Sequence, residues 1–431
     1  MILEKTIKRI ELLHPKVIDL SLERLETLLE KLDNPEKKLP PVIHVAGTNG
    51  KGSTISILRS IQSAAGRSSH VYTSPHLVDL TERFLIADKE VKATTLVKLL
   101  KQCEEANAGS AITFFEIITA AGFLAFSTFK ADLLLLEVGL GGRFDATNVI
   151  NNPILSIITP ISLDHQHYLG NTLSEIAFEK AGILKDNKPA IIGKQYPEAL
   201  EVIKSKAAET NSKLFVFERD WNISETKDAI KFEVDGDTHY FEKPSLRGTH
   251  QIHNSGIAIA AAHYMNKIFP IKNNAIDTGL KRVRWPARLQ KINKGPLIDL
   301  LPDQVELWLD GGHNQDASLV ISETIRTWRK QDPSLTFHLI FGSLNNRQTE
   351  SLLAPFAEII DLVQTVAIPR HESTASPSNT ANIALSLGFN ATPSTSLFSA
   401  IQAIISKSSG KRIILVYGSL YLAGSILEKN Y

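Results

Sequence analysis

The fold is decided by residues 42–59, which read VIHVAGTNGKGSTISILR. The apolar run at 42–46 predicts a strand, and residues 53–65 have the periodicity of a helix that covers one face of a sheet. Glycines between them allow the backbone to wrap phosphate groups, helix N-terminal amides point at phosphate oxygens, and Lys51 adds a positive charge. The order of strand, glycine loop and helix therefore predicts a phosphate-binding loop.

This loop departs from the common form of the motif. The glycine expected five positions before Gly50 is Val45, and Gly52 separates Lys51 from Ser53. A glycine-rich turn that binds nothing is the alternative, but the flanking strand and helix favour nucleotide binding. The residues expected to hold the nucleotide are Gly47, Thr48, Asn49, Gly50, Lys51, Gly52 and Ser53.

The rest of the chain alternates short apolar runs with longer helical segments, which predicts a mainly parallel α/β sheet. Residues 214–242 instead alternate polar and apolar positions around a turn at 235–237, which predicts a small antiparallel appendage. After residues 285–288 the βα alternation resumes. We therefore expect a phosphate-loop domain with an N-terminal helical segment at residues 1–285, and a smaller Rossmann-like α/β domain at 286–431.

Individual elements are also predicted. The expected strands of the first domain are residues 42–46, 133–138, 154–159 and 190–193, and its clearest helices are 53–65 and 115–129. The expected strands of the second domain are residues 306–309, 337–341, 362–368 and 412–416.

Composition excludes several classes of partner. The chain has 431 residues, with 47 basic and 46 acidic side chains, so no global field attracts nucleic acid or an anionic membrane. No apolar run approaches the roughly 18 residues of a spanning helix, and the N-terminus lacks the apolar core of a signal peptide. The single cysteine, Cys103, excludes an intramolecular disulfide and lies in a predicted amphipathic helix. We expect a cytoplasmic monomer that binds neither nucleic acid nor membrane.

Polar residues follow two of the predicted strands, at the sheet edge where α/β proteins bind ligands. Glu137 ends one of them, and a buried carboxylate there needs a partner. Mg²⁺ bridging it to a nucleotide would supply one, and so would an ion pair with Arg143; the residues alone leave both open. His165 follows the next strand, but imidazole is not a preferred ligand of Mg²⁺. Lys180 ends a predicted helix and by itself indicates only a solvated surface.

Ten motifs occur in the order typical of the folylpolyglutamate synthases and dihydrofolate synthases of the Mur ligase superfamily, and the chain resembles that family over nearly its whole length. They are residues 47–53, 73–77, 115–116, 137–143 with 145–148, 164–165, 179–183, 248–251 with Asn254, 285–288, 310–314 and 417–419. The resemblance implies an ATP-binding Mur-ligase-type domain followed by a glutamate-ligase domain. Gly312 departs from the alanine usual in the family, which adds backbone flexibility without removing a ligand.

The resemblance also implies roles for individual residues. ATP contacts are implied for Asn254, Arg288 and Asp310, and catalytic roles for Lys51, Lys180 and His313. Magnesium ligands are implied at Ser74, Glu137, His165 and Lys180. Lys180 matches a lysine that the family carbamylates: CO2 on a neutral amine gives an anionic oxygen ligand, but the amine must first lose a proton against a reference pKa of about 10.4.

The family's reaction, carried over, is an ADP-forming amide ligation of folate biosynthesis and one-carbon metabolism. A substrate carboxylate attacks the γ-phosphate of ATP, and the amino group of L-glutamate then displaces phosphate from the acyl phosphate. Lys51 and Mg²⁺ would neutralise the charge that develops on the transferred phosphoryl group.

The acceptor carboxylate is expected to belong to dihydropteroate, a folate or both. Residues 18–24 resemble the N-terminal segment of bacterial enzymes that act on both, and we favour such a bifunctional enzyme. The resemblance implies that the acceptor binds to Thr113, Phe114, Phe115, Glu116, Asp145 and Ala146. Without the resemblance, residues 18–24 would be read as an amphipathic helix and the aromatics as a core face.

Two other functions are compatible with a phosphate-binding loop. A UDP-muramyl-peptide ligase shares the phosphate loop but needs a UDP-binding domain before it, and the 46 residues that precede Gly47 are too few for a typical domain. A regulatory nucleotide-binding protein would hydrolyse ATP slowly and consume no glutamate. Only the family resemblance of Glu137, His165 and Lys180 argues against that second alternative.

Overall fold

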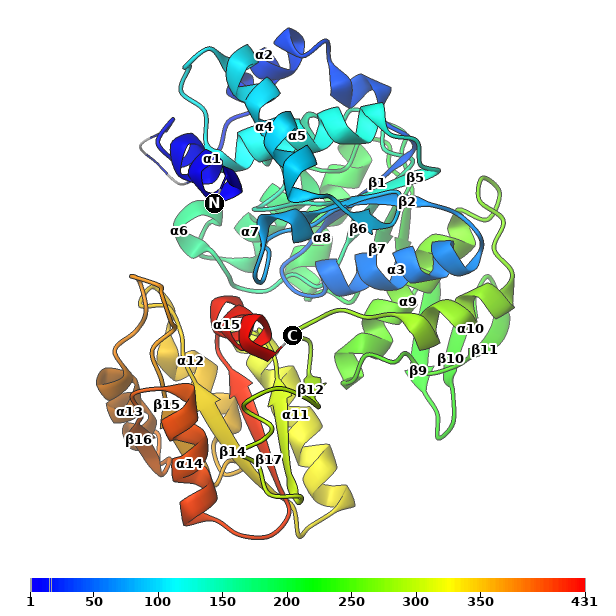
Figure 1. Cartoon of the computed structure of the whole chain (residues 1–431). Helices are drawn as coiled ribbons and strands as arrows, with labels where there is room; N and C mark the ends of the chain where they lie inside the picture. Colours follow the sequence, from blue (N-terminus) through cyan, green and yellow to red (C-terminus); the bar gives the residue numbers. More distant parts are fainter. Residues whose placement is uncertain (1, 15, 17, 431) are drawn as a thin grey trace. The chain divides into compact units, whose positions relative to one another are not determined.

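The computed structural model describes residues 2–14, 16 and 18–430, with only the backbone at 429 and 430. The chain divides into two compact units, drawn in Figure 1. The first extends to Ser245 and includes Gln251–Arg284, and the second comprises Leu246–His250 and the chain from Trp285 onward. The short segment Leu246–His250 thus groups with the second unit, where the Arg247 guanidinium lies 5.7 Å from the centre of the Trp308 ring.

The first unit is built on an eight-stranded sheet with strand order β4-β3-β2-β5-β1-β6-β7-β8. The strands are β1 (Val42–Ala46), β2 (Ser69–Tyr72), β3 (Phe84–Ile86), β4 (Lys89–Glu90), β5 (Leu133–Glu137), β6 (Leu155–Ile158), β7 (Ala190–Ile192) and β8 (Leu214–Val216). All pair in parallel except β3 and β4 at one edge. The prediction of a mainly parallel sheet is confirmed. The central strands β1 and β5 are buried along their whole length, which is why they read as near-continuous apolar runs.

Helices flank this sheet. They are α1 (Ile2–Glu11), α2 (Glu23–Lys31), α3 (Lys51–Ala64), α4 (Ala93–Asn107), α5 (Phe114–Thr128), α6 (Gln166–Leu169), α7 (Leu173–Ala181), α8 (Pro197–Glu209), α9 (Thr249–Tyr264) and α10 (Asn273–Arg282), with 3₁₀ turns η1 (Pro35–Lys38), η2 (Leu80–Arg83) and η3 (Ala146–Val149). The N-terminal helices α1 and α2 contact α4 and α5 over one apolar cluster. Cys103 lies on the buried face of α4, and burial raises the pKa of its thiol to about 12, so this cysteine is unreactive filler.

A small antiparallel sheet is appended to the first unit, as predicted. It consists of β9 (Trp221–Glu225), β10 (Ile230–Val234) and β11 (Asp237–Phe241). Asp235 and Gly236 both have positive φ, the requirement of a tight two-residue hairpin turn. The predicted start of this appendage, at residue 214, is too early, because β9 begins at Trp221. Leu214–Val216 instead pairs in parallel with β7 at the edge of the main sheet, because a local apolar pattern does not specify which sheet a strand joins.

The second unit has a six-stranded sheet with order β12-β13-β17-β14-β15-β16, in which only β12 is antiparallel to its neighbour. This confirms the Rossmann-like prediction. The strands are β12 (Gln290–Ile292), β13 (Val305–Leu309), β14 (Thr336–Phe341), β15 (Leu362–Thr365), β16 (Ala391–Pro393) and β17 (Arg412–Tyr417). The helices are α11 (Gln315–Gln331), α12 (Thr349–Leu353), α13 (Pro377–Ser386), α14 (Leu397–Lys407) and α15 (Leu420–Asn430), with the 3₁₀ turn η4 (Ala354–Phe356).

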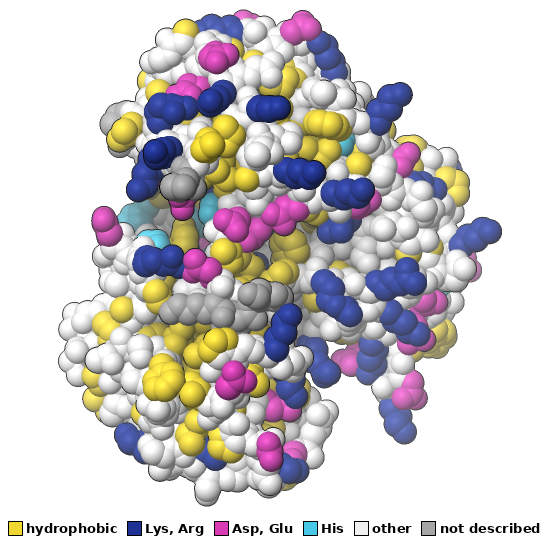
Figure 2. Space-filling view, in the orientation of Figure 1, with side chains coloured by type: hydrophobic (Ala, Val, Ile, Leu, Met, Phe, Trp, Pro, Cys, Tyr) yellow, Lys and Arg dark blue, Asp and Glu magenta, His cyan; other side chains and the backbone are white. Residues whose placement is uncertain are grey.

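The surface matches the balanced composition. Figure 2 shows lysine and arginine side chains scattered over the visible face with acidic side chains among them, and the formal net charge of the chain is +1. No helix in the described part of the chain combines the length and apolarity needed to cross a membrane.

Helix α3, which follows the glycine loop, is held along its length by α10, beside it in Figure 1. A Cβ added at Gly279 of α10 would lie 2.6 Å from the Cα of Ile61, so the two backbones touch. The hydroxyl of Ser60 donates to the Gly279 carbonyl at 2.7 Å, and that of Ser56 donates to the Arg284 carbonyl at 2.9 Å. Contact between the backbones therefore fixes the position of α3.

We predict that Gly279→Ala destabilises the first unit by about 1–3 kcal/mol, because the added methyl meets backbone that cannot move aside. Urea unfolding followed by circular dichroism measures this. Thr278→Ala on the same helix is the control, with an expected change within about 0.5 kcal/mol. Equal unfolding midpoints for the two variants would contradict the close contact.

Candidate active site

The glycine loop joins β1 to α3 and depends on glycine at two positions. Gly47 has φ of 144° and Gly50 has φ of 86°, both in the region that favours glycine. A Cβ at Gly47 would lie 1.9 Å from Thr159 Oγ1, and one at Gly50 would lie 2.4 Å from Asn254 Oδ1. The second approach brings Asn254, on α9, directly against the loop.

One side of the loop is held in place by hydrogen bonds to the chain that follows β6. The amides of Thr48 and Asn49 both donate to the Pro160 carbonyl, at 2.9 and 3.2 Å, and the Thr48 hydroxyl donates to the Ser162 carbonyl at 3.1 Å. The first helical bond runs from Thr54 N to Gly50 O. Amides in the first turn of a helix lack intrahelical acceptors. The donors best placed to bind phosphate oxygens are therefore the amides in the first turn of α3 and the Lys51 ammonium group.

Glu137 at the end of β5 faces this loop. Its Oε1 lies 4.0 Å from Lys51 Nζ, and its Oε2 accepts a hydrogen bond from the Ser74 amide at 3.2 Å. Arg143, the alternative partner, makes its ion pair with Glu179 at 2.7 Å. The fold thus places a buried carboxylate beside the lysine of the loop, the arrangement in which a metal ion can link a protein carboxylate to phosphates.

Lys180 is buried, not solvated. It lies on α7 with 5% of its surface exposed, and its Nζ donates to the Gly47 carbonyl at 3.0 Å. Burial, with the positive charge of Lys51 nearby, lowers the pKa of Lys180 to about 7, although Asp164 and Asp145 oppose the shift. Near neutral pH a large fraction of this amine is uncharged, as reaction with CO2 requires.

His165 stands directly before α6 with a positive φ of 52°, and its Nε2 lies 3.9 Å from Asp164 Oδ2. Across the described residues, no three histidine, cysteine or acidic side chains gather as a metal site. A metal ion at Glu137 would therefore need other oxygen ligands, and nucleotide phosphates are of the right chemistry.

The residues expected to bind the acceptor also have structural roles. Thr113 and Glu116 form a capping box at the start of α5, and the Glu116 carboxylate receives two hydrogen bonds from Arg24, at 2.9 and 3.1 Å. A Cβ on Gly139 would lie 2.4 Å from the Phe115 ring, so this ring covers the loop that follows Glu137. Phe114 and Phe115 are partly buried against the apolar cluster.

In the second unit, three predicted residues meet at the carboxyl end of β13. Asp310 accepts hydrogen bonds from the amides of Leu289 at 2.8 Å and Gly312 at 2.7 Å. Burial raises the pKa of Asp310, and the charge of Arg288 opposes that shift. The ring of His313 contacts the Gly311 carbonyl through Nδ1 at 3.0 Å.

Packing, as well as backbone flexibility, favours glycine at position 312. A Cβ at this position would lie 2.6 Å from both Cε2 and Oη of Tyr417, a side chain buried completely. The Tyr417 hydroxyl is in turn 2.9 Å from the Ser318 hydroxyl. The glycine therefore makes room for a tyrosine on the neighbouring strand β17.

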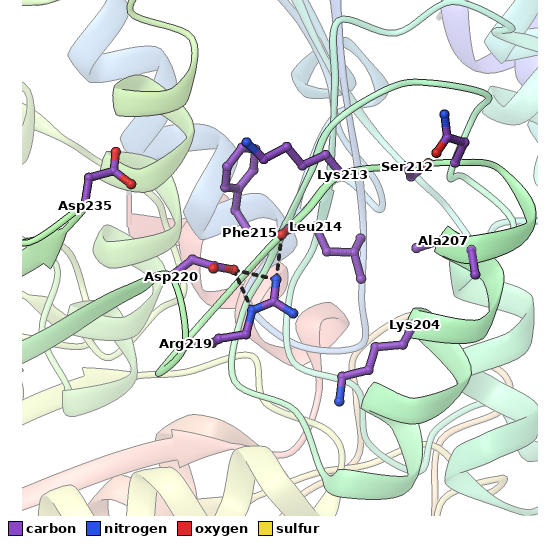
Figure 3. Close-up of a pocket in the computed structure, with 11 residues that line it drawn as sticks. Lys204, Ala207, Ser212, Lys213, Leu214, Phe215, Arg219, Asp220 and Asp235 are labelled. Atoms are coloured by element: carbon purple, nitrogen blue, oxygen red, sulfur yellow. Dashed lines mark hydrogen bonds and ion pairs between the residues drawn. The ribbon is translucent and has the colours of Figure 1, made fainter.

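A hollow of about 550 Å³ lies elsewhere in the first unit, between α8 and β8 (Figure 3). Its three cations already have partners: Arg219 is held by Asp220 and by the Leu214 carbonyl, Lys204 pairs with Glu201, and Lys213 lies over the Phe215 ring. None of the predicted site residues lines it. We assign it no function.

Comparison with known proteins places these features in a family. Residues 45–262 match the Mur ligase middle domain, and residues 297–429 match the dihydrofolate synthetase C-terminal domain. The chain is 34% identical over 430 residues to the dihydrofolate synthase/folylpolyglutamate synthase of Bacillus subtilis, covering 95% of this chain and 94% of that relative. This chain belongs to the dihydrofolate synthase/folylpolyglutamate synthase family. It is an ATP-dependent ligase that adds glutamate in folate metabolism.

Solved structures of this family share the fold of the ligase over nearly its whole length. Escherichia coli FolC in complex with DHPP and ADP has a TM-score of 0.87 and 30% identity, with 99% of this chain and 97% of that chain covered. The bifunctional enzyme of Yersinia pestis, complexed with AMPPNP and Mn ion, has a TM-score of 0.87 and 28% identity, with the same coverage.

Two residues that the structure brings to this site, Asp164 and Arg24, have no role predicted from the sequence. Asp164 acts on the charge of Lys180, and Arg24 binds Glu116. Arg24 also donates to the Asp19 carboxylate at 3.0 Å, so residues 18–24 are an ion-paired segment that becomes helical only from Glu23. Both residues lie in segments that resemble the family, and this resemblance was the only sequence feature that could have pointed to them.

The buried lysine of this ligase predicts a pH-dependent stability. The pKa is about 7 in the folded chain and about 10.4 in the unfolded one. Between these values the unfolded chain holds the extra proton, so the free-energy cost of burying Lys180 falls as pH rises. Lys180→Met lacks this slope, so its stability advantage over wild type should shrink from pH 7 to pH 9.

Urea unfolding of both proteins without nucleotide, metal or bicarbonate measures that difference, because titrations common to both cancel. A difference independent of pH would mean that Lys180 keeps an ordinary pKa.

Proposed function

We propose that this ligase adds L-glutamate to both dihydropteroate and folates through an acyl phosphate, with ATP and Mg²⁺. The observation that carries the proposal is that Lys51 and Lys180 both contact the Gly47 carbonyl while Glu137 lies 4.0 Å from Lys51. The family to which the chain belongs supports it. The muramyl-peptide and regulatory alternatives are set aside because the relatives are folate ligases.

Phosphoryl transfer needs positive charge where negative charge develops. The amides in the first turn of α3 and the Lys51 ammonium would hold the β- and γ-phosphates, and Asn254 would contact the nucleotide beside Gly50. In the second unit, Arg288 and Asp310 would contact ATP and His313 would act in catalysis. These assignments rest on their matching positions in the family.

Ser74, Glu137, His165 and a carbamylated Lys180 would hold the divalent metal. A bound ion would draw charge from the transferred phosphoryl group. The carbamate forms when the neutral Nζ attacks the carbon of CO2 and releases a proton, which turns the lysine into an anionic oxygen ligand. Burial of the amine against Gly47 supports this step, because it lowers the pKa of Lys180 to about 7 and so raises the neutral fraction of the amine.

The acceptor would lie along Thr113, Phe114, Phe115 and Glu116 at the start of α5. It would also contact Asp145 and Ala146, which follow β5. Phe115 covers the loop after Glu137, so an acceptor held there would have its reacting carboxylate within the same region as the metal ligand. The relative from Bacillus subtilis bears both activities in its name, which favours dual acceptors.

We predict that ADP and phosphate form only when a pterin carboxylate and L-glutamate are both present. The acyl phosphate must be consumed by the amine for the cycle to complete, so omission of glutamate should reduce steady turnover to background. Coupled ADP release, with each substrate omitted in turn, measures this. Glutamate-independent turnover at the full rate would point to a simple ATPase.

We also predict that purified wild type forms the amide with dihydropteroate and with tetrahydrofolate, as product analysis by mass spectrometry would detect. Use of only one acceptor would restrict the proposal to a monofunctional enzyme.

Lys180→Ala should lower kcat by about 100-fold or more, since even residues that merely support metal ligands contribute roughly 10–100-fold. Wild type assayed in CO2-free buffer should lose activity and recover it with bicarbonate. Lys185→Ala is the matched control, because that lysine binds the Asn148 carbonyl and not the loop; it should keep the bicarbonate response. An unaffected Lys180→Ala enzyme would refute a carbamate ligand.

A further inference from the structure

A buried histidine connects the strand that feeds the glycine loop to the loop that carries Asp145. His44 lies on β1, three residues before Gly47, and is fully buried. Its Nε2 is 2.8 Å from Thr147 Oγ1, and the Thr147 hydroxyl lies 2.5 Å from Asp145 Oδ1. The three side chains therefore form one continuous path through the interior of the first unit.

The direction of the hydrogen bonds follows from the number of protons. Thr147 has one hydroxyl proton, and the Asp145 carboxylate can only accept it. The Thr147 oxygen must then accept from His44, so His44 carries its proton on Nε2. Burial lowers the pKa of His44 to about 3, so the ring is neutral. Its hydrogen bond to Thr147 therefore determines which ring nitrogen carries the proton.

The histidine is not explained by packing alone. Its Nδ1 is buried without a hydrogen-bond partner, and a buried polar atom without a partner costs free energy that an apolar side chain would avoid. On the two neighbouring strands, Leu136 and Ser156 stand opposite His44 in register, so the position is central in the sheet. A polar side chain there has a specific hydrogen bond to make.

Asp145 is the end of that path. Its other oxygen accepts from the Leu140 amide at 2.8 Å, and its Oδ1 also accepts from the Thr147 amide at 3.0 Å. These bonds define the shape of the loop from Gly139 to η3, which Phe115 covers at its start. A change in the Thr147 hydroxyl would therefore be transmitted to the Asp145 carboxylate and to the backbone around it.

We infer that His44 is a positioning residue for the acceptor: through the Thr147 hydroxyl it orients the Asp145 carboxylate toward the pterin substrate. The inference rests on the proposed function, in which Asp145 contacts the acceptor. It adds a residue with no substrate contact of its own, on the strand that also leads into the phosphate loop.

The test compares His44→Leu with His44→Gln, whose amide nitrogen can donate to Thr147 as Nε2 does. His44→Leu should raise the KM for dihydropteroate about 3- to 10-fold, the equivalent of one hydrogen bond. The KM for ATP and kcat should stay within about twofold, since phosphate-loop contacts are untouched. His44→Gln should restore most of the acceptor KM.

A purely structural role would lower the unfolding temperature and leave the acceptor KM unchanged, or would raise the KM values for ATP and acceptor together. Either result overturns the inference, as does a His44→Gln enzyme that behaves like His44→Leu. Wild type is assayed alongside as the test of the proposed function. If wild type uses neither dihydropteroate nor folate, the proposed function fails and the inference fails with it. If wild type uses an acceptor but His44→Leu leaves the acceptor KM unchanged, only the inference fails.

A second pair guards against a His44→Leu enzyme that does not fold. Thr147→Val preserves shape and removes the hydroxyl, whereas Thr147→Ser keeps it. Thr147→Val should reproduce the rise in acceptor KM, and Thr147→Ser should not. In the double variant His44→Leu with Thr147→Val, the rise should be no greater than in either single variant, because residues in one hydrogen-bonded network are not additive. Multiplied effects would show that the two residues act separately.

Discussion

Two lysine side chains converge on one carbonyl oxygen, and the candidate site is organised around that meeting. Lys51 Nζ lies 3.1 Å from Gly47 O, and Lys180 Nζ lies 3.0 Å from the same atom. Two ammonium groups so close repel each other, and burial makes the repulsion costly. The neutral form of Lys180 relieves this repulsion, and so would any anion placed between the two lysines. Glu137, whose Oε1 lies 4.0 Å from Lys51 Nζ, supplies part of this negative charge, and a phosphate group would add to it.

The sheet makes this convergence possible. Lys51 begins α3 immediately after the loop from β1, while Lys180 comes from α7, far along the chain. Glu137 arrives from β5, the strand beside β1, and the chain after β6 holds the loop through the Pro160 carbonyl. Adjacent parallel strands end at one sheet edge, so residues distant in sequence are delivered together. The backbone contact of α10 with α3 fixes the helix whose first turn forms one wall.

The same dependence on close packing recurs at the edges of the site. Gly47, Gly50 and Gly139 each stand where a side chain from another segment occupies the space of a Cβ. Gly312 does so in the second unit, against Tyr417. At each of these glycines, a side chain from another segment lies directly against the backbone.

The amino-acid sequence by itself determined the family, the glycine loop and the two α/β sheets, because these depend on local order: an apolar run, glycines, a helical period. It could not determine that Arg143 pairs with Glu179, that Leu214–Val216 joins the main sheet, or that Lys180 is buried. Those depend on which surfaces meet, and a lysine near the end of a helix reads as solvated until the fold covers it. Only the tertiary structure placed its amine against Gly47, and desolvation there, with the nearby charge of Lys51, turned an ordinary lysine into one whose pKa is about 7.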